Sequence, residues 1–77
     1  MAHIVYAGYG VGNSVVDVTE PVANLYSDGQ REFWASNDLG QDPAPGDTKH
    51  LFILWAQNSV LVSGVTSEGA EQPISIP

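Results

Sequence analysis

The chain has 77 residues, no cysteine and a formal net charge of −7, because nine acidic residues oppose only Arg31 and Lys49. One domain of this length buries about 60% of its unfolded surface, so its stability is marginal, and no disulfide or thiolate metal site can reinforce it. Phosphate contacts supply most nucleic-acid affinity, so this composition argues against binding DNA, RNA or anionic membranes. The longest apolar run, Leu51 to Ala56, is too short to span a bilayer, and no signal peptide is evident, so we expect a soluble protein.

Two strands are predicted at the start of the chain. The segment 3–9 is rich in β-branched and aromatic residues, and strict alternation places Ile4 and Tyr6 on the same face. The glycines at positions 8, 10 and 12 favour a turn after this strand. The segment 15–18 contains three valines around Asp17 and predicts a second short strand.

A short helical segment is predicted over 21–26. Thr19 is an N-cap candidate, and Pro21 in the first turn is compatible with a helix start. Apolar residues then recur at the i, i+3 and i+4 spacing of one helix face, at Val22, Leu25 and Tyr26. Gly29 is expected to end the helix, because glycine readily adopts the left-handed backbone found there.

Four further strands are predicted over 30–36, 50–57, 60–66 and 73–76, with a turn at Asn58-Ser59. In the strand 30–36, alternation places Phe33 and Ala35 opposite Glu32 and Trp34, so one of the two aromatic residues is expected to be half exposed. The strand 50–57 is apolar on both faces, which predicts a central strand covered on two sides. Short strands with turn signals at intervals of about 8–12 residues predict an all-β fold: a small antiparallel β-sandwich or barrel of five to six strands with one short helical segment, forming a single domain, 1–77.

A polar loop over 36–47 contains two prolines and two glycines, and no regular element is expected in it. Calcium prefers carboxylate, amide and carbonyl oxygens, and the loop offers four such side chains, Asn37, Asp38, Asp42 and Asp47. Their spacing is not that of an EF-hand. The alternative interpretation is structural: Asn and Asp cap turns by bonding their own backbone, while prolines stiffen the loop.

A sugar site is a second interpretation of the same region. Such a site combines an aromatic platform with Asn or Asp side chains, and Trp34 lies just before Asn37 and Asp38. The alternative is that the two tryptophans are core or sheet-face residues. The predicted ligand-binding residues are Trp34, Asn37, Asp38, Asp42 and Asp47. No catalytic residue is predicted, because His3 and His50 lie in expected strands without a nucleophile motif.

Several segments also suggest a family. They are Ile4-Val5-Tyr6-Ala7 with Tyr9-Gly10, Val16-Asp17-Val18-Thr19, Ser36-Asn37-Asp38, Asp42-Pro43-Ala44-Pro45-Gly46 with Lys49, and Glu68-Gly69 before Pro73-Ile74. Together they resemble an uncharacterised small domain at the C-terminus of mitochondrial DnaJ-like subfamily C proteins, which also occurs in bacterial and fungal proteins. The resemblance runs nearly end to end, and its Asp-Val-Thr and Asp-Pro-Ala-Pro-Gly segments are the most specific. It implies an accessory module and carries over no activity, cofactor or catalytic residue.

The sequence therefore predicts a non-catalytic binding or interaction module without a cofactor, unless the loop binds calcium. The alternative is a carbohydrate-binding lectin, with or without calcium, that uses the loop 37–47. A freestanding copy is expected to bind a glycan, a protein or copies of itself. Self-association is predicted because marginal burial and an apolar central strand leave a surface or a sheet edge for another copy to cover.

Overall fold

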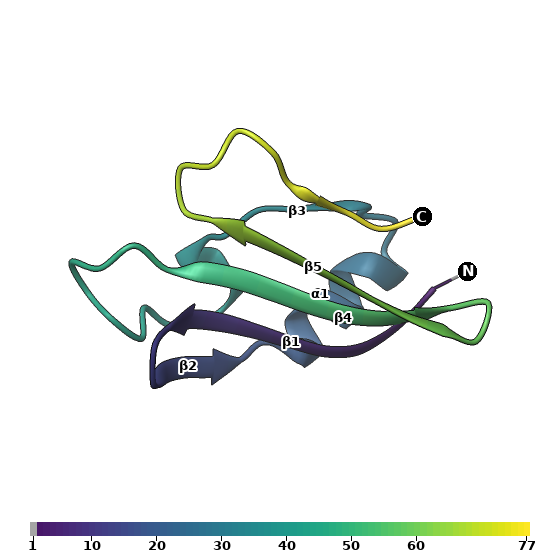
Figure 1. The fold of residues 1–77 in the computed structure, drawn as a ribbon, viewed down its shortest axis with the longest axis horizontal. Coiled ribbons are helices and arrows are strands. Elements are labelled where there is room, and N and C mark those ends of the chain that lie inside the picture. Colours follow the sequence, from purple (N-terminus) through teal and green to yellow (C-terminus); the bar gives the residue numbers. More distant parts are fainter. Residues whose placement is uncertain (1) are drawn as a thin grey trace.

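The strands of the computed structural model, which describes residues 2–77, form two antiparallel sheets with one α-helix (Figure 1). In chain order the elements are β1 (His3–Val11), β2 (Ser14–Asp17), α1 (Thr19–Ser27), β3 (Glu32–Phe33), the single 3-10 turn η1 (Asn37–Leu39), β4 (His50–Gln57), β5 (Val60–Ser67) and β6 (Ile74–Ser75). The larger sheet has the order β2-β1-β4-β5, and β3 pairs with β6. The all-β prediction is confirmed, and the six strands within residues 2–77 do not close into a barrel.

The helix and the β3–β6 ribbon cover the same face of the larger sheet, which we call the inner face. In Figure 1, α1 lies behind the strands of this sheet. Val22 and Tyr26 of the helix are buried in one hydrophobic cluster with Phe33 of β3 and Ile74 of β6. Gly64 of β5 makes room for the ribbon, because a Cβ added there would lie 2.9 Å from the Ile74 side chain. Within residues 2–77 no helix is long and apolar enough to cross a membrane.

The opposite face of the sheet, which we call the outer face, is not covered by any other element of residues 2–77. Along β4, Leu51, Ile53 and Trp55 are buried on the inner face, whereas Phe52 and Leu54 alternate with them and remain partly exposed. The predicted strand boundaries of 50–57 are confirmed. The expectation that this strand is covered on both sides is wrong, because helix and ribbon both pack on the inner face.

A β-bulge changes the alternation near the start of β1. The register with β4 shifts between Ile4 and Tyr6, so Val5 is an extra residue without a partner. Ile4 is consequently buried while Tyr6 is 41% exposed. The prediction that these two side chains share a face is wrong, because it assumed an uninterrupted period of two residues.

The helix begins at Thr19, two residues before the predicted start, and the N-cap position is Val18, which has no side-chain cap. The prediction that Thr19 is the N-cap is therefore wrong. Its hydroxyl instead accepts a hydrogen bond from the backbone N–H of Ala7 at 2.9 Å, while Asp17 Oδ1 accepts from the Thr19 N–H at 2.8 Å. The first bond ties the start of α1 to strand β1, and the second ties it to the end of β2.

The helix ends at Ser27 with Asp28 as its C-cap, and Gly29 follows it as the predicted terminating glycine. This residue has φ of +110°, and its N–H donates to the Tyr26 carbonyl at 3.0 Å. The next N–H, of Gln30, donates to the Leu25 carbonyl at 3.0 Å, which completes a Schellman motif. The glycine thus ends the helix and directs the chain into β3.

The predicted strand 30–36 is much shorter in the structure. Only Glu32 and Phe33 pair with another strand, because the partner β6 is itself two residues long. The loop 36–47 also differs from expectation, since η1 forms a 3-10 turn in it. Ser36 caps this turn by accepting a hydrogen bond from the Asp38 N–H at 3.1 Å.

Candidate functional site

Lys49 is a charged residue in the interior, with only 4% of its surface exposed. Its Nζ lies 3.0 Å from Asp42 Oδ1 and 3.3 Å from Glu68 Oε1, and it donates to the Ala44 carbonyl at 3.3 Å. The Lys49 N–H also donates to Glu68 Oε1 at 2.8 Å, and the Glu68 N–H donates to the Lys49 carbonyl at 2.9 Å. This one ammonium group therefore joins the long loop to the end of β5.

Tyr9 extends the same interaction to β1. Its side chain is buried, and its hydroxyl donates to Asn37 Oδ1 at 2.7 Å. Burial, and then the nearby Glu68 carboxylate, raise the pKa of Tyr9 to about 12. We call Tyr9, Asn37, Asp42, Lys49 and Glu68 the Lys49 cluster. Its members come from four of the segments on which the family resemblance rests, and they are far apart in the sequence.

The charges of the Lys49 cluster stabilise one another. The hydrogen bond to Lys49 holds the pKa of Asp42 below its ordinary value, and the backbone N–H of Lys49 does the same for Glu68. Asp42 in turn raises the pKa of Lys49. The cluster is therefore an internally bonded set of groups in which one ammonium is shared by two carboxylates, which is the arrangement expected of a structural anchor rather than of a reactive site.

Acidification is expected to weaken this anchor. A carboxylate whose pKa is lowered by folding contributes stability above its unfolded pKa and loses it as the pH falls through the folded pKa. The ordinary values are 3.8 for Asp42 and 4.5 for Glu68. We therefore expect these groups to leave the melting temperature unchanged between about pH 5 and 8, and to lower it progressively below that range. Thermal melts of the parent chain and of Glu68→Gln between pH 7 and pH 2 test this. We expect the melting temperature of Glu68→Gln to fall less steeply with decreasing pH than that of the parent chain. Equal slopes in the two proteins would contradict the prediction.

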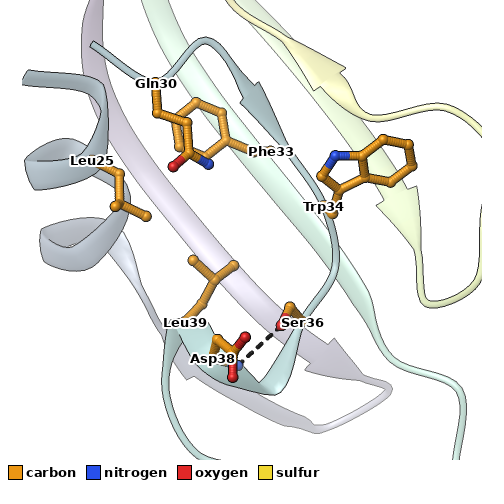
Figure 2. A pocket seen from close by; sticks show the side chains of 7 residues that line it. All are labelled: Leu25, Gln30, Phe33, Trp34, Ser36, Asp38 and Leu39. Carbon is orange, nitrogen blue, oxygen red and sulfur yellow. Dashed lines mark hydrogen bonds between the residues drawn. The ribbon is translucent and has the colours of Figure 1, made fainter. Parts of the chain in front are cut away.

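A groove lies between α1, β3 and η1, with a cavity volume of about 410 Å³. Figure 2 shows the Trp34 indole on one side of it and Leu25 of α1 on the other, with Phe33 between them. Phe33 and Leu39 are buried, whereas Trp34 is 45% exposed, so Trp34 is the half-exposed aromatic residue that was expected in the segment 30–36. The polar side chains lining the groove are Gln30, Ser36 and Asp38.

The five predicted ligand-binding residues do not form one site. Trp34 and Asp38 both line the groove. Asn37 and Asp42 belong to the Lys49 cluster, where their oxygens accept hydrogen bonds or pair with Lys49. Asp47 is exposed elsewhere on the loop, and its N–H donates to the Ala44 carbonyl at 3.1 Å. Ligand binding by these five residues remains a prediction.

Sequence reasoning missed most of the groove. Leu25 and Phe33 were assigned to a helix face and a strand face, and Gln30 and Leu39 were given no role. No local pattern identifies these four residues as neighbours, since three separate elements carry them. Lys49 was equally missed, although a lone lysine at the start of an apolar strand was a usable signal, because such a residue needs a carboxylate partner when it is buried.

Within residues 2–77, no three or more histidine or acidic side chains are grouped closely enough to hold a metal ion. The loop carboxylates are separated, because Asp42 pairs with Lys49 while Asp38 lies at the groove. The candidate calcium site therefore has no assembled ligand set in this part of the chain.

The fold also brings a serine to one histidine. His50 Nδ1 lies 2.8 Å from Ser67 Oγ, and the register pairs these residues across β4 and β5. No carboxylate of residues 2–77 forms a hydrogen bond or ion pair with this imidazole. The pair is a cross-strand contact of the outer face, and it lacks the orienting acid of a catalytic triad.

Comparison with known proteins returned no matching family model, no matching curated protein and no matching solved structure. The resemblance to the DnaJ-associated domain stays a prediction.

Proposed function

We propose that this chain is a non-catalytic binding module whose ligand site is the groove beside Trp34. One observation carries the proposal: a half-exposed indole borders an apolar floor and lies next to a carboxylate, Asp38, that forms no ion pair or side-chain hydrogen bond within residues 2–77. A side chain that the fold neither buries nor neutralises remains available to a ligand. The groove volume of about 410 Å³ lies within the usual range of small-ligand sites.

The shape of the groove supports a ligand with one apolar face and several polar groups. Phe33 and Leu39 provide an apolar floor, and Trp34 provides a flat aromatic surface. Gln30 uses its Nε2 to donate to the Glu32 carbonyl at 2.9 Å, which leaves its Oε1 as an acceptor at the groove. The lining therefore combines hydrophobic contact with a few polar groups that fix orientation.

A glycan is the second, more specific candidate. A sugar ring presents an apolar C–H face that stacks on indole, and hydroxyls that bond carboxylate and amide oxygens. Trp34, Asp38 and Gln30 supply these groups around one groove. The lectin proposal thus rests on the groove rather than on the whole loop 37–47, and it does not include calcium.

A glycan array followed by fluorescence titration tests both claims: that the groove is a ligand site, and that its ligand is a glycan. We expect Trp34→Ala and Asp38→Ala to weaken binding of any array hit by at least about tenfold, as for central contact residues at interfaces, with little change in melting temperature. Asp47→Ala is the matched control, because it removes an exposed carboxylate of the same loop outside the groove. Asn37 is unsuitable for this purpose, since its Oδ1 accepts the Tyr9 hydroxyl hydrogen bond.

The outcomes separate the candidates. Binding that depends on Trp34 and Asp38 but not on Asp47 supports the lectin function. A silent array rejects it, and the general proposal is then tested by screening small molecules and peptides for a rise in melting temperature. A ligand whose affinity is unchanged by Trp34→Ala overturns the groove as the binding site.

A further inference from the structure

The outer face of the larger sheet is mostly apolar. The three longest strands, β1, β4 and β5, contain no Asp, Glu, Lys or Arg, although the chain has 11 such residues. On this face Leu61 is 64% exposed and Val65 is 66% exposed. The other large apolar or aromatic side chains on it, all at least partly exposed, are Tyr6, Val15, Phe52 and Leu54. Its polar side chains are His3, His50, Ser63 and Ser67.

The centre of the outer face is filled by aromatic rings. Gly8 of β1 lies opposite Phe52 of β4, and a Cβ added to it would lie 2.8 Å from Tyr6 Oη and 2.9 Å from the Phe52 ring. The two side chains therefore lie over the glycine instead of standing away from the sheet. This arrangement leaves a broad surface that can accept another layer, because stacked sheets pack about 10 Å apart.

The distribution of charge argues against a basic partner at this surface. The acidic residues lie on α1, β3, the loops and the edge strand β2, where Asp17 is the one carboxylate at the border of the outer face. A basic protein would be attracted to those regions and not to a neutral sheet face. An identical neutral face is compatible, because packing two of them together keeps most carboxylates of both copies at the periphery.

The area of the face is close to the lower limit for a dimer. Its four strands hold 29 residues. With strands about 4.8 Å apart and residues about 3.3 Å apart along each strand, the face measures roughly 460 Å². Two copies then bury on the order of 900 Å² together, which is the size of a weak specific interface. No Asp, Glu, Lys or Arg side chain of β1, β4 or β5 has to be desolvated, so these strands add no penalty for burying a charge.

We propose that the outer face packs against the outer face of a second copy, related by a two-fold axis, to form a four-layer dimer with the sheets in aligned packing. Aligned sheets in such sandwiches cross at about −30°. Val65 and Leu61 become buried in the dimer. The groove beside Trp34 lies among α1, β3 and η1, on the other side of the sheet, so dimer formation leaves it accessible. The inference is thus independent of the ligand.

Sedimentation equilibrium of the intact chain tests the dimer. We expect twice the chain mass of 8.2 kDa at tens of micromolar. Val65→Lys places an ammonium group in the apolar contact of each copy and is expected to weaken dimerisation by at least about tenfold. Val60→Lys is the matched control: Val60 is 59% exposed on the same strand, but alternation along β5 places it on the opposite side from Val65, so the dimer is expected to persist.

Thermal melting shows whether each variant is folded, and Leu61→Lys serves as a second interface variant if Val65→Lys is unfolded. A monomeric parent chain at 100 micromolar or above overturns the inference. A dimer that persists in both interface variants also overturns it and moves the contact to another surface, such as the unpaired edge of β5. Loss of the dimer in Val60→Lys as well as in Val65→Lys contradicts the assignment to the outer face.

Discussion

Replacing Lys49 with methionine is expected to lower the melting temperature by roughly 10 °C or more, because it leaves the carboxylates of Asp42 and Glu68 without their counter-ion. It also removes the hydrogen bond to the Ala44 carbonyl. Methionine has a similar length and apolar stem, so the change in volume is small. The lost stability therefore measures the charge and the hydrogen bond of the ammonium group, and not the packing of its stem. Thermal unfolding followed by circular dichroism gives the value.

Arg31→Met is the matched control, since Arg31 and Lys49 are the only lysine or arginine residues and both changes make the net charge one unit more negative. Arg31 donates to the Tyr26 carbonyl at 2.9 Å, and its guanidinium lies 4.0 Å from the Tyr26 ring centroid. Such a surface contact contributes about 0.5–1 kcal/mol, so the control should lose less than about 8 °C. Equal losses in both variants would show that net charge, rather than the Lys49 cluster, controls stability.

A triple variant distinguishes two causes of the stability lost in Lys49→Met: the missing attraction to the ammonium group, and the carboxylates that are left unpaired. Adding Asp42→Asn and Glu68→Gln to Lys49→Met removes both orphaned carboxylates, so part of the lost stability should return. The recovered part should be largest at neutral pH and small near pH 2, where carboxyl groups are protonated in every variant. Failure to recover any stability would mean that Lys49 acts mainly through its bond to Ala44.

Gly10→Ala is expected to reduce the free energy of unfolding by about 3 kcal/mol or more, which corresponds to a fall of more than about 12 °C in melting temperature. Gly10 has φ of +157°, and an added Cβ would collide with the Ser14 carbonyl oxygen and lie 2.7 Å from Val15 Cα. These are backbone atoms of the paired strand β2, so no side-chain rotation relieves the overlap. The hairpin would have to separate.

Gly12→Ala is the control for this prediction. Gly12 lies in the turn of the same hairpin with φ of +57°, but an added Cβ meets no atom within 4 Å. Only the left-handed backbone penalty of about 1–2 kcal/mol then applies. Chemical denaturation of both variants measures the difference. If Gly10→Ala costs no more than Gly12→Ala, the close approach of β1 and β2 at this position is not essential.

The local elements were predictable from the sequence because their causes are local. The β4–β5 hairpin follows from two apolar segments around Asn58-Ser59, and both turn residues adopt the positive φ of a tight hairpin turn, 53° and 66°. Gly29 ended the helix for the same kind of reason. One half-exposed aromatic residue in the segment 30–36 was likewise expected, since alternation places Phe33 and Trp34 on opposite faces.

The tertiary structure alone decided which residues meet and which face of the sheet stays open. Tyr9 reaches Asn37 across 28 residues, and Lys49 reaches Glu68 across 19, so no short window of sequence contains either contact. The predicted site separated for the same reason: the Asn37 side chain accepts a hydrogen bond from Tyr9, whereas its neighbour Asp38 lines the groove. The sequence by itself determined an acidic, cysteine-free β-domain, whereas chain packing determined its buried lysine, its groove and its uncovered apolar face, because burial depends on segments that are distant along the chain.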